Sequence, residues 1–231
     1  MATLLGYQSA VQASSTFERW WQCSGAWVEP LNQRRDGESG VQLLQPRNPS
    51  SPALYSKRQT GHLYRSLLHP WGRPTIVREL LAYQAFARLG ITVPTLVYGS
   101  ARKQAGHWQA LLITQALPGF ISLDQWYAEE RSAEESICVL TALANTLKRM
   151  HQGRWQHGCC YAKHIFVKVS DLEDNSPSAE IALLDLEKSR RRWRKADASR
   201  HDMRQLQRHR GAMPDEDWDF LMEAYASLMQ R

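Results

Sequence analysis

The position of one aspartate in this 231-residue chain indicates that its carboxylate has a chemical role. Asp185 follows three apolar residues and precedes Leu186, so the sequence predicts that a buried strand over residues 180–186 delivers its carboxylate. A lone carboxylate in apolar surroundings costs free energy unless it is paired or binds a metal ion. Because Mg²⁺ prefers oxygen ligands, we predict that Asp185 is a metal ligand.

Glu187 stands two positions after Asp185 and would project from the same face of that strand. It could therefore give the metal a second acidic ligand. An ion pair with Lys188 or Arg190 accounts for Glu187 almost as well.

A lysine and a glutamate are spaced as a phosphoryl-transfer site would need them. Lys57 lies near the end of a predicted strand over residues 53–59, and Glu79 lies in a predicted helix over residues 75–89 that ends at Gly90. If that helix packs behind the sheet, Glu79 can hold Lys57 in a salt bridge and the lysine can contact phosphate groups. From spacing alone, two solvated charges account for the pair equally well.

Two glycines, Gly37 and Gly40, lie in a predicted turn between strands at residues 27–29 and 41–45. Their backbone N–H groups could cover phosphates, as a glycine-rich loop does. A hairpin turn needs the same residue type, so the glycines by themselves indicate little.

The segment from His157 to His164 has the spacing of a kinase catalytic loop, HxDxxxxN, with one central exchange. His157 fills the first position and His164 the final, metal-binding position, while Cys159 stands where the aspartate is expected. Lys163 would lie close to a transferred phosphoryl group. A thiol accepts hydrogen bonds poorly, so Cys159 weakens the general-base role. General bases typically contribute only about a hundred- to ten-thousand-fold, so a slow kinase is still physically allowed.

The histidines and cysteines of this loop also allow two different roles. Mg²⁺ binds histidine weakly, so His164 could instead donate a hydrogen bond to Asp185 or to a phosphate, or be an ordinary histidine at the edge of the core. The second possible role is a zinc site made of His157, Cys159, Cys160 and His164, although neighbouring cysteines on an extended segment point to opposite sides.

Several short motifs, in this order, carry a resemblance that covers residues 34–202. They are Tyr55-Ser56-Lys57-Arg58-Gln59, Pro74-Thr75-Ile76-Val77-Arg78-Glu79, Leu89-Gly90-Ile91, Leu111-Leu112-Ile113-Thr114, Gly158-Cys159-Cys160-Tyr161, Lys163-His164-Ile165-Phe166 and Leu184-Asp185-Leu186-Glu187-Lys188. Together they resemble the lipopolysaccharide core kinase family, in its InaA-like branch.

The resemblance implies an α+β, two-lobed protein-kinase-like fold in one domain, residues 1–231. Its N-lobe, residues 17–117, would hold a small mixed sheet plus one helix, and residues 118–231 would form a reduced helical C-lobe. The implied activity is ATP- and Mg²⁺-dependent phosphorylation of a sugar hydroxyl of lipopolysaccharide core or of a related small acceptor. The alternative is a nucleotide-binding pseudokinase that serves as a stress-response scaffold, because the catalytic aspartate is replaced by Cys159.

Charge and cysteine content indicate where such a protein would work. The formal net charge is +6, and six of the eight residues from Lys188 to Lys195 are Lys or Arg. Such a run is typical of a solvated segment, and it would also suit an anionic glycolipid. The four cysteines form no spaced framework, which predicts thiols in a reducing compartment. We therefore expect a cytoplasmic monomer that contacts the inner membrane face peripherally and does not bind nucleic acid.

Overall fold

The computed structural model describes residues 10–34, 37–46, 48, 50–67, 69–172 and 176–230. The chain divides into two compact units. The first unit contains residues 1–77 and 95–116, and the second contains residues 78–94 and 117–231. The segment 78–94, which was expected in the N-lobe, thus belongs with the second unit.

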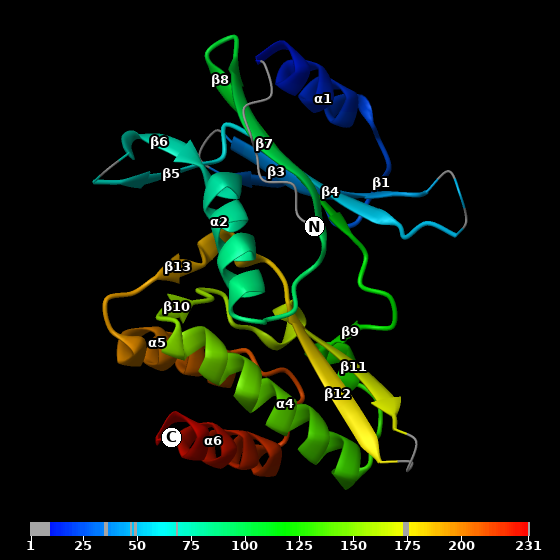
Figure 1. Ribbon diagram of the computed structural model, residues 1–231, viewed down its shortest axis with the longest axis vertical. Coiled ribbons are helices and arrows are strands. Elements are labelled where there is room, and N and C mark those ends of the chain that lie inside the picture. The colour runs from blue at the N-terminus through cyan, green and yellow to red at the C-terminus, as the bar shows by residue number, and fades with distance from the viewer. Residues whose placement is uncertain are drawn as a thin grey trace. The chain divides into compact units, whose positions relative to one another are not determined.

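The first unit is built on a six-stranded sheet with the order β1-β3-β4-β8-β7, in which β2 also pairs with β3 (Figure 1). Its strands are β1 (Ala26–Trp27), β2 (Asn32–Arg34), β3 (Gly37–Leu44), β4 (Leu54–Thr60), β7 (Leu96–Gln104) and β8 (His107–Gln115). A separate hairpin is formed by β5 (Leu63–Ser66) and β6 (His69–Pro74). All these pairings are antiparallel, so the prediction of a mixed sheet was wrong.

Helix α1 (Ala10–Gln22) covers part of this sheet and was not predicted. Phe17 is buried against Leu111 and Ile113 of β8. The Arg102 guanidinium lies 4.3 Å from the centre of the Phe17 ring and forms a 2.8 Å salt bridge with Glu18. An amphipathic helix thus completes the core of the first unit, whose one whole helix is α1, since most of α2 belongs to the second unit.

Helix α2 (Thr75–Arg88) begins and ends where its sequence predicts. Its start is fixed by the buried amide of Gln59, whose Oε1 accepts hydrogen bonds from Thr75 Oγ1 at 2.8 Å and from the Ile76 N–H at 3.3 Å. These bonds satisfy groups that a helix N-terminus leaves unpaired. At the other end, Gly90 adopts a φ of +65°, which stops the helix at low steric cost.

The second unit is mostly helical. Its further elements are β9 (Ile121–Ser122), α3 (Leu123–Trp126), α4 (Ala133–Gln152), β10 (Trp155–Gln156), η1 (Ala162–His164), β11 (Ile165–Asp171), β12 (Pro177–Leu183), η2 (Leu186–Lys188), β13 (Arg190–Arg191), α5 (Lys195–Arg208) and α6 (Asp215–Gln230). Helix α4 packs against α6 and against the β11–β12 hairpin (Figure 1). None of the helices in the described residues is long and apolar enough to cross a membrane.

The sequence of helix α4 explains where the helix begins and which of its residues are buried. Ser132 and Glu135 form a capping box at its start, which pairs backbone and side-chain groups reciprocally. Leu140, Leu143 and Leu147 recur at helical spacing and are fully buried on one face of the helix. Ile137, three positions before Leu140, is half exposed.

The strand that precedes Asp185 begins and ends three residues earlier than predicted. β12 ends at Leu183, and the residues after Asp185 form the short helix η2. Asp185 therefore follows the strand instead of lying within it, and Glu187 does not share a strand face with it. The basic run is also ordered locally, because β13 pairs with β10 and α5 begins at Lys195.

Candidate active site

The loop from His157 to His164 is anchored by a buried carboxylate on α5. Asp202 accepts hydrogen bonds from the backbone N–H groups of His157 at 2.6 Å and Gly158 at 3.0 Å. Its oxygens also lie 3.2 Å from His151 Nε2 and 3.3 Å from His201 Nδ1. The carboxylate thus fixes the backbone at the start of the loop.

The charge on Asp202 is maintained although the side chain is fully buried. Burial by itself raises the pKa of a carboxyl group, but the hydrogen bonds from His151 and His201 outweigh it and hold the pKa of Asp202 well below its ordinary value. Tyr225 continues this network, since its hydroxyl lies 2.7 Å from His151 Nδ1 and donates to Ser199 Oγ at 2.7 Å. Asp202 is therefore an acceptor that stays ionised.

His157 is enclosed in this part of the second unit. Burial lowers its pKa, with Asp202 acting in the opposite direction, so the imidazole is held neutral. Its Nδ1 accepts a hydrogen bond from the Cys159 N–H at 3.3 Å, which places the ring proton on Nε2. His157 therefore shapes the loop from inside and is not a solvent-facing acid or base.

The loop packs directly on the segment that carries Asp185. The Leu184 N–H donates to the His164 carbonyl at 2.9 Å, and Ser189 Oγ donates to the His157 carbonyl at 2.9 Å. Gly158 has a φ of +84°, and a Cβ there would lie 2.6 Å from the Lys188 carbonyl oxygen. Only glycine fits such an approach, which brings both ends of the predicted catalytic loop against residues 184–189.

His164 and Asp185 face each other across this junction. His164 Nδ1 lies 2.9 Å from the Cys159 carbonyl, so this nitrogen carries a proton and donates it. Nε2 is then the nitrogen with the lone pair in the neutral ring, and it lies 3.7 Å from Asp185 Oδ2. The ring is also stacked between His157 and Tyr161, with centroid distances of 6.3 and 5.3 Å. The structure brings together two residues predicted to bind metal.

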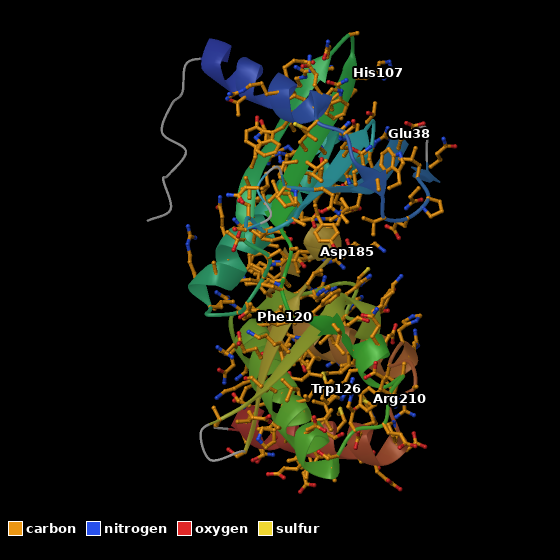
Figure 2. The ribbon with its side chains drawn as sticks, turned by 90° about the vertical axis from the view of Figure 1, so that its right-hand side faces the viewer. Glu38, His107, Phe120, Trp126, Asp185 and Arg210 are labelled. Carbon is orange, nitrogen blue, oxygen red and sulfur yellow. The ribbon has the colours of Figure 1, made fainter. Side chains whose placement is uncertain are left out.

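Asp185 has an unusual backbone conformation (its side chain is labelled in Figure 2). Its φ of 53° and ψ of 58° place it in the left-handed region, which costs free energy for residues other than glycine and is least unfavourable for Asn and Asp. Its side chain is 38% exposed, so the prediction of a buried carboxylate was wrong. The turn directs an accessible carboxylate toward His164.

The backbone of Glu187 is held by a hydrogen bond from helix α2. Arg78 of α2 donates through Nε to the Glu187 carbonyl oxygen at 2.6 Å. This bond ties α2 to the residues that follow Asp185, within the second unit. Because Glu187 lies in η2, the structural argument for it as a second ligand on the strand face no longer applies.

Cys159 lies next to two polar side chains. It is 4% exposed, and the side chains of both Lys188 and Tyr161 hydrogen-bond with it. Cys159 raises the pKa of Lys188, whereas burial followed by Cys159 raises the pKa of Tyr161. Lys188 is therefore held as an ammonium group and Tyr161 as a phenol, and neither is a ready general base.

The zinc site considered from the sequence is not formed. Burial raises the pKa of Cys160 well above its ordinary value. Within the described part of the chain, no group of three or more His, Cys, Asp and Glu side chains is placed to hold a metal ion. The four cysteines do not form disulfides, as the sequence predicts.

Of the remaining predicted site residues, Lys163 lies in the same loop as His164 and is exposed on η1. Lys57 lies in β4 of the first unit, whereas Glu79 is buried on α2 in the second, and their salt bridge stays a prediction.

Gly37 and Gly40 lie within β3 and not in a loop. A Cβ at Gly37 would lie 2.8 Å from the Gly61 backbone, and one at Gly40 would lie 2.6 Å from the Trp27 ring. Close packing thus accounts for both glycines.

Sequence reasoning did not identify Asp202 as a site residue. Asp202 lies in the middle of α5, which begins at Lys195, on the same face as the buried Ala198 and Leu206. A charged residue on the apolar face of a helix is the signal that could have identified it.

Comparison with known proteins identifies the family of this chain and supports its fold. The family model for the lipopolysaccharide kinase (Kdo/WaaP) family matches residues 18–225. The chain is 44% identical to Protein InaA of Escherichia coli (strain K12) over 216 residues, which is 92% of this chain and 96% of that protein. The solved structure "WaaP in complex with acyl carrier protein" matches with a TM-score of 0.67 at 14% identity, over 93% of this chain and 84% of that one. That likeness supports the protein-kinase-like fold. The chain therefore belongs to the lipopolysaccharide kinase (Kdo/WaaP) family.

Proposed function

We propose that this protein is an ATP-dependent phosphotransferase that phosphorylates a sugar hydroxyl of lipopolysaccharide core or a related small acceptor. The observation that carries the proposal is the 3.7 Å approach of His164 Nε2 and Asp185 Oδ2 on a loop fixed by Asp202. Phosphoryl transfer depends mainly on positioning and charge, and a rigid loop with an accessible carboxylate provides both.

A divalent metal ion fits the His164–Asp185 pair if a nucleotide supplies further ligands. The pair offers one imidazole nitrogen and one carboxylate, and Mg²⁺ in nucleotide sites is commonly held by one or two carboxylates plus phosphate oxygens and water. The nitrogen ligand also suits Mn²⁺, which accepts imidazole more readily than Mg²⁺ does. When bound with ATP, the metal would neutralise charge on the phosphates.

The protein's own groups would then act on the phosphates and the acceptor. We assign Lys57 to the phosphates, with Glu79 as its partner, and Lys163 to the transferred phosphoryl group. His157 would act as a positioning residue, because it is buried and neutral. Cys159 cannot match a carboxylate as a base, so we expect slow turnover.

The direct test is transfer of labelled γ-phosphate from ATP to purified lipopolysaccharide core or its sugars. Incorporation of label that requires both the protein and a divalent metal would support the proposal. ATP binding without transfer to any tested core sugar would contradict it and favour the second candidate.

The second candidate is a pseudokinase that binds a nucleotide and serves as a scaffold. The burial of Cys159 and its hydrogen bonds with Lys188 and Tyr161 favour it, because these contacts occupy the position where a kinase presents a base. Replacement of Cys159 by Asp distinguishes the two candidates. A phosphotransferase that lacks only its base should become faster, whereas a scaffold should stay inactive.

We assign the basic run, Lys188 to Lys195, to an anionic glycolipid at the cytosolic face of the inner membrane. Arg190 and Arg191 are exposed, and their strand β13 pairs antiparallel with β10. Trp193 is 95% exposed within the same run. An exposed tryptophan among arginines suits a phosphate-bearing lipid surface.

Charge reversal tests this assignment. Replacing Arg190, Arg191 and Arg192 by Glu should weaken binding to liposomes that contain lipopolysaccharide by at least about a hundredfold at low salt, since each basic residue near such a surface contributes about 1 kcal/mol. Cosedimentation at increasing salt concentrations measures this. A control with the same change of net charge replaces the exposed residues Arg88, Lys103 and Arg208 by Glu. Equal binding by both variants would exclude the basic run as the lipid-binding surface.

A further inference from the structure

The β5–β6 hairpin carries apolar side chains that nothing described in the structure covers. Leu67 is fully exposed and Trp71 is 91% exposed, and they lie four positions apart around the hairpin's turn. The hairpin forms its own two-stranded sheet and projects away from the six-stranded sheet of the first unit (Figure 1). Soluble proteins rarely present large apolar groups together at a projecting tip unless something binds there.

The charge of the hairpin indicates which kind of partner it can bind. Residues 63–74 contain no Asp or Glu, and they contain Arg65 and Arg73. Arg65 is exposed, while Arg73 Nη1 lies 3.3 Å from His69 Nε2 at the base of the turn. Cationic groups that flank exposed leucine and tryptophan side chains complement a surface with anionic headgroups above an apolar layer.

The backbone of the hairpin argues against a partner strand. Pro70 and Pro74 lack an N–H group, so β6 cannot present a regular edge for pairing. The pairing register also shifts between Tyr64 and Ser66, and Gly72 has a φ of +87°. These irregularities prevent addition of another strand, which leaves the side chains of the tip as the binding elements.

We propose that the β5–β6 hairpin inserts Leu67 and Trp71 into the interface of an anionic lipid bilayer, while Arg65 contacts lipid phosphates. This contact is separate from the phosphotransferase site and from the basic run. It would hold the first unit on the membrane whether or not the chain turns over ATP.

The test compares wild type with the double variant Leu67→Ser, Trp71→Ser in cosedimentation with vesicles of phosphatidylglycerol and phosphatidylcholine. The variant should bind at least about tenfold more weakly, because burial of each such side chain is typically worth a factor of ten or more. The control double variant, Leu81→Ser with Leu172→Ser, changes two half-exposed apolar residues away from the hairpin and should bind like wild type. Equal binding by all three proteins, or equal loss in both variants, would overturn the proposal.

A second readout reports insertion directly. Lipids with brominated acyl chains quench tryptophans that enter the bilayer, and Trp71→Phe isolates the contribution of Trp71 among the nine tryptophans. We expect quenching in wild type that is clearly reduced rather than lost in Trp71→Phe, because Trp193 of the basic run can also contact the lipid. Arg65→Glu should reduce binding to anionic vesicles. Quenching that is the same in wild type and Trp71→Phe would contradict insertion of the hairpin even if the whole protein binds lipid through the basic run.

Discussion

Replacing Asp185 by Asn is expected to lower phosphoryl transfer by at least about a thousandfold while the protein stays folded. The side chain is partly exposed and faces His164, so the exchange removes the proposed anionic metal ligand but leaves the packing intact. Asn also tolerates the left-handed backbone at this position, with its φ of 53°, better than Ala would. Transfer of labelled phosphate, together with the melting temperature, measures both effects.

The control for this experiment is Glu180→Gln. Glu180 is an exposed acid on β12, and it lies 3.7 Å from Lys168 in a surface salt bridge. It should keep wild-type activity and stability, because such pairs contribute little. Full activity of Asp185→Asn would remove Asp185 from the site.

Replacing Asp202 by Asn is expected to destabilise the protein by about 3 kcal/mol. The amide puts two donors in place of one acceptor oxygen, although the backbone N–H groups of His157 and Gly158 both need acceptors. His151 and His201 also lose their anionic partner. Urea unfolding followed by circular dichroism measures the loss. We also expect faster proteolysis within residues 157–164, since their anchor is weakened.

Asp197→Asn, on the same helix, is the matched control. Asp197 lies 4.0 Å from Arg200 near the surface, so its replacement should change the free energy of unfolding by no more than about 0.5 kcal/mol. Equal stability of wild type and Asp202→Asn would show that Asp202 does not hold the loop.

The contribution of the Asp202 carboxylate to the stability of the protein should depend on pH in the acidic range. Because the pKa of Asp202 is lower in the folded than in the unfolded protein, its contribution to stability is complete above the unfolded value near 4 and is lost as pH falls toward the folded value. Wild type should therefore lose stability below about pH 4 more steeply than Asp202→Asn does. Parallel pH profiles would contradict the assigned ionisation.

A local pattern in the sequence predicted helix α2. Gly90 indicated where this helix ends, and the structure confirms the helix. Helix α1 was missed, although Phe17, Trp20 and Trp21 recur at helical spacing and pack on the sheet. The end of β12 was predicted three residues too late because apolar residues continue past Leu183, and periodicity does not indicate the turn at Asp185.

Only part of the site could be predicted from the sequence. The spacing of His157, His164 and Asp185 suggested one site, and the structure brings the loop and the aspartate together. The support from Asp202 could not be predicted, because its hydrogen bonds span more than forty residues and no local pattern encodes them. The position of Glu187 was predicted wrongly because a strand was assumed where the short helix η2 forms.

Binding of ATP with a divalent metal tests the central claim most directly. Calorimetric titration should show binding by wild type and by the control Lys103→Ala, and binding should be lost or greatly weakened in Lys57→Ala and Asp185→Asn. Repeating the titration without metal should also weaken binding, since Asp185 acts through the ion. If wild type binds no nucleotide with Mg²⁺ or Mn²⁺, or if both site variants bind as wild type does, the proposed nucleotide site is contradicted.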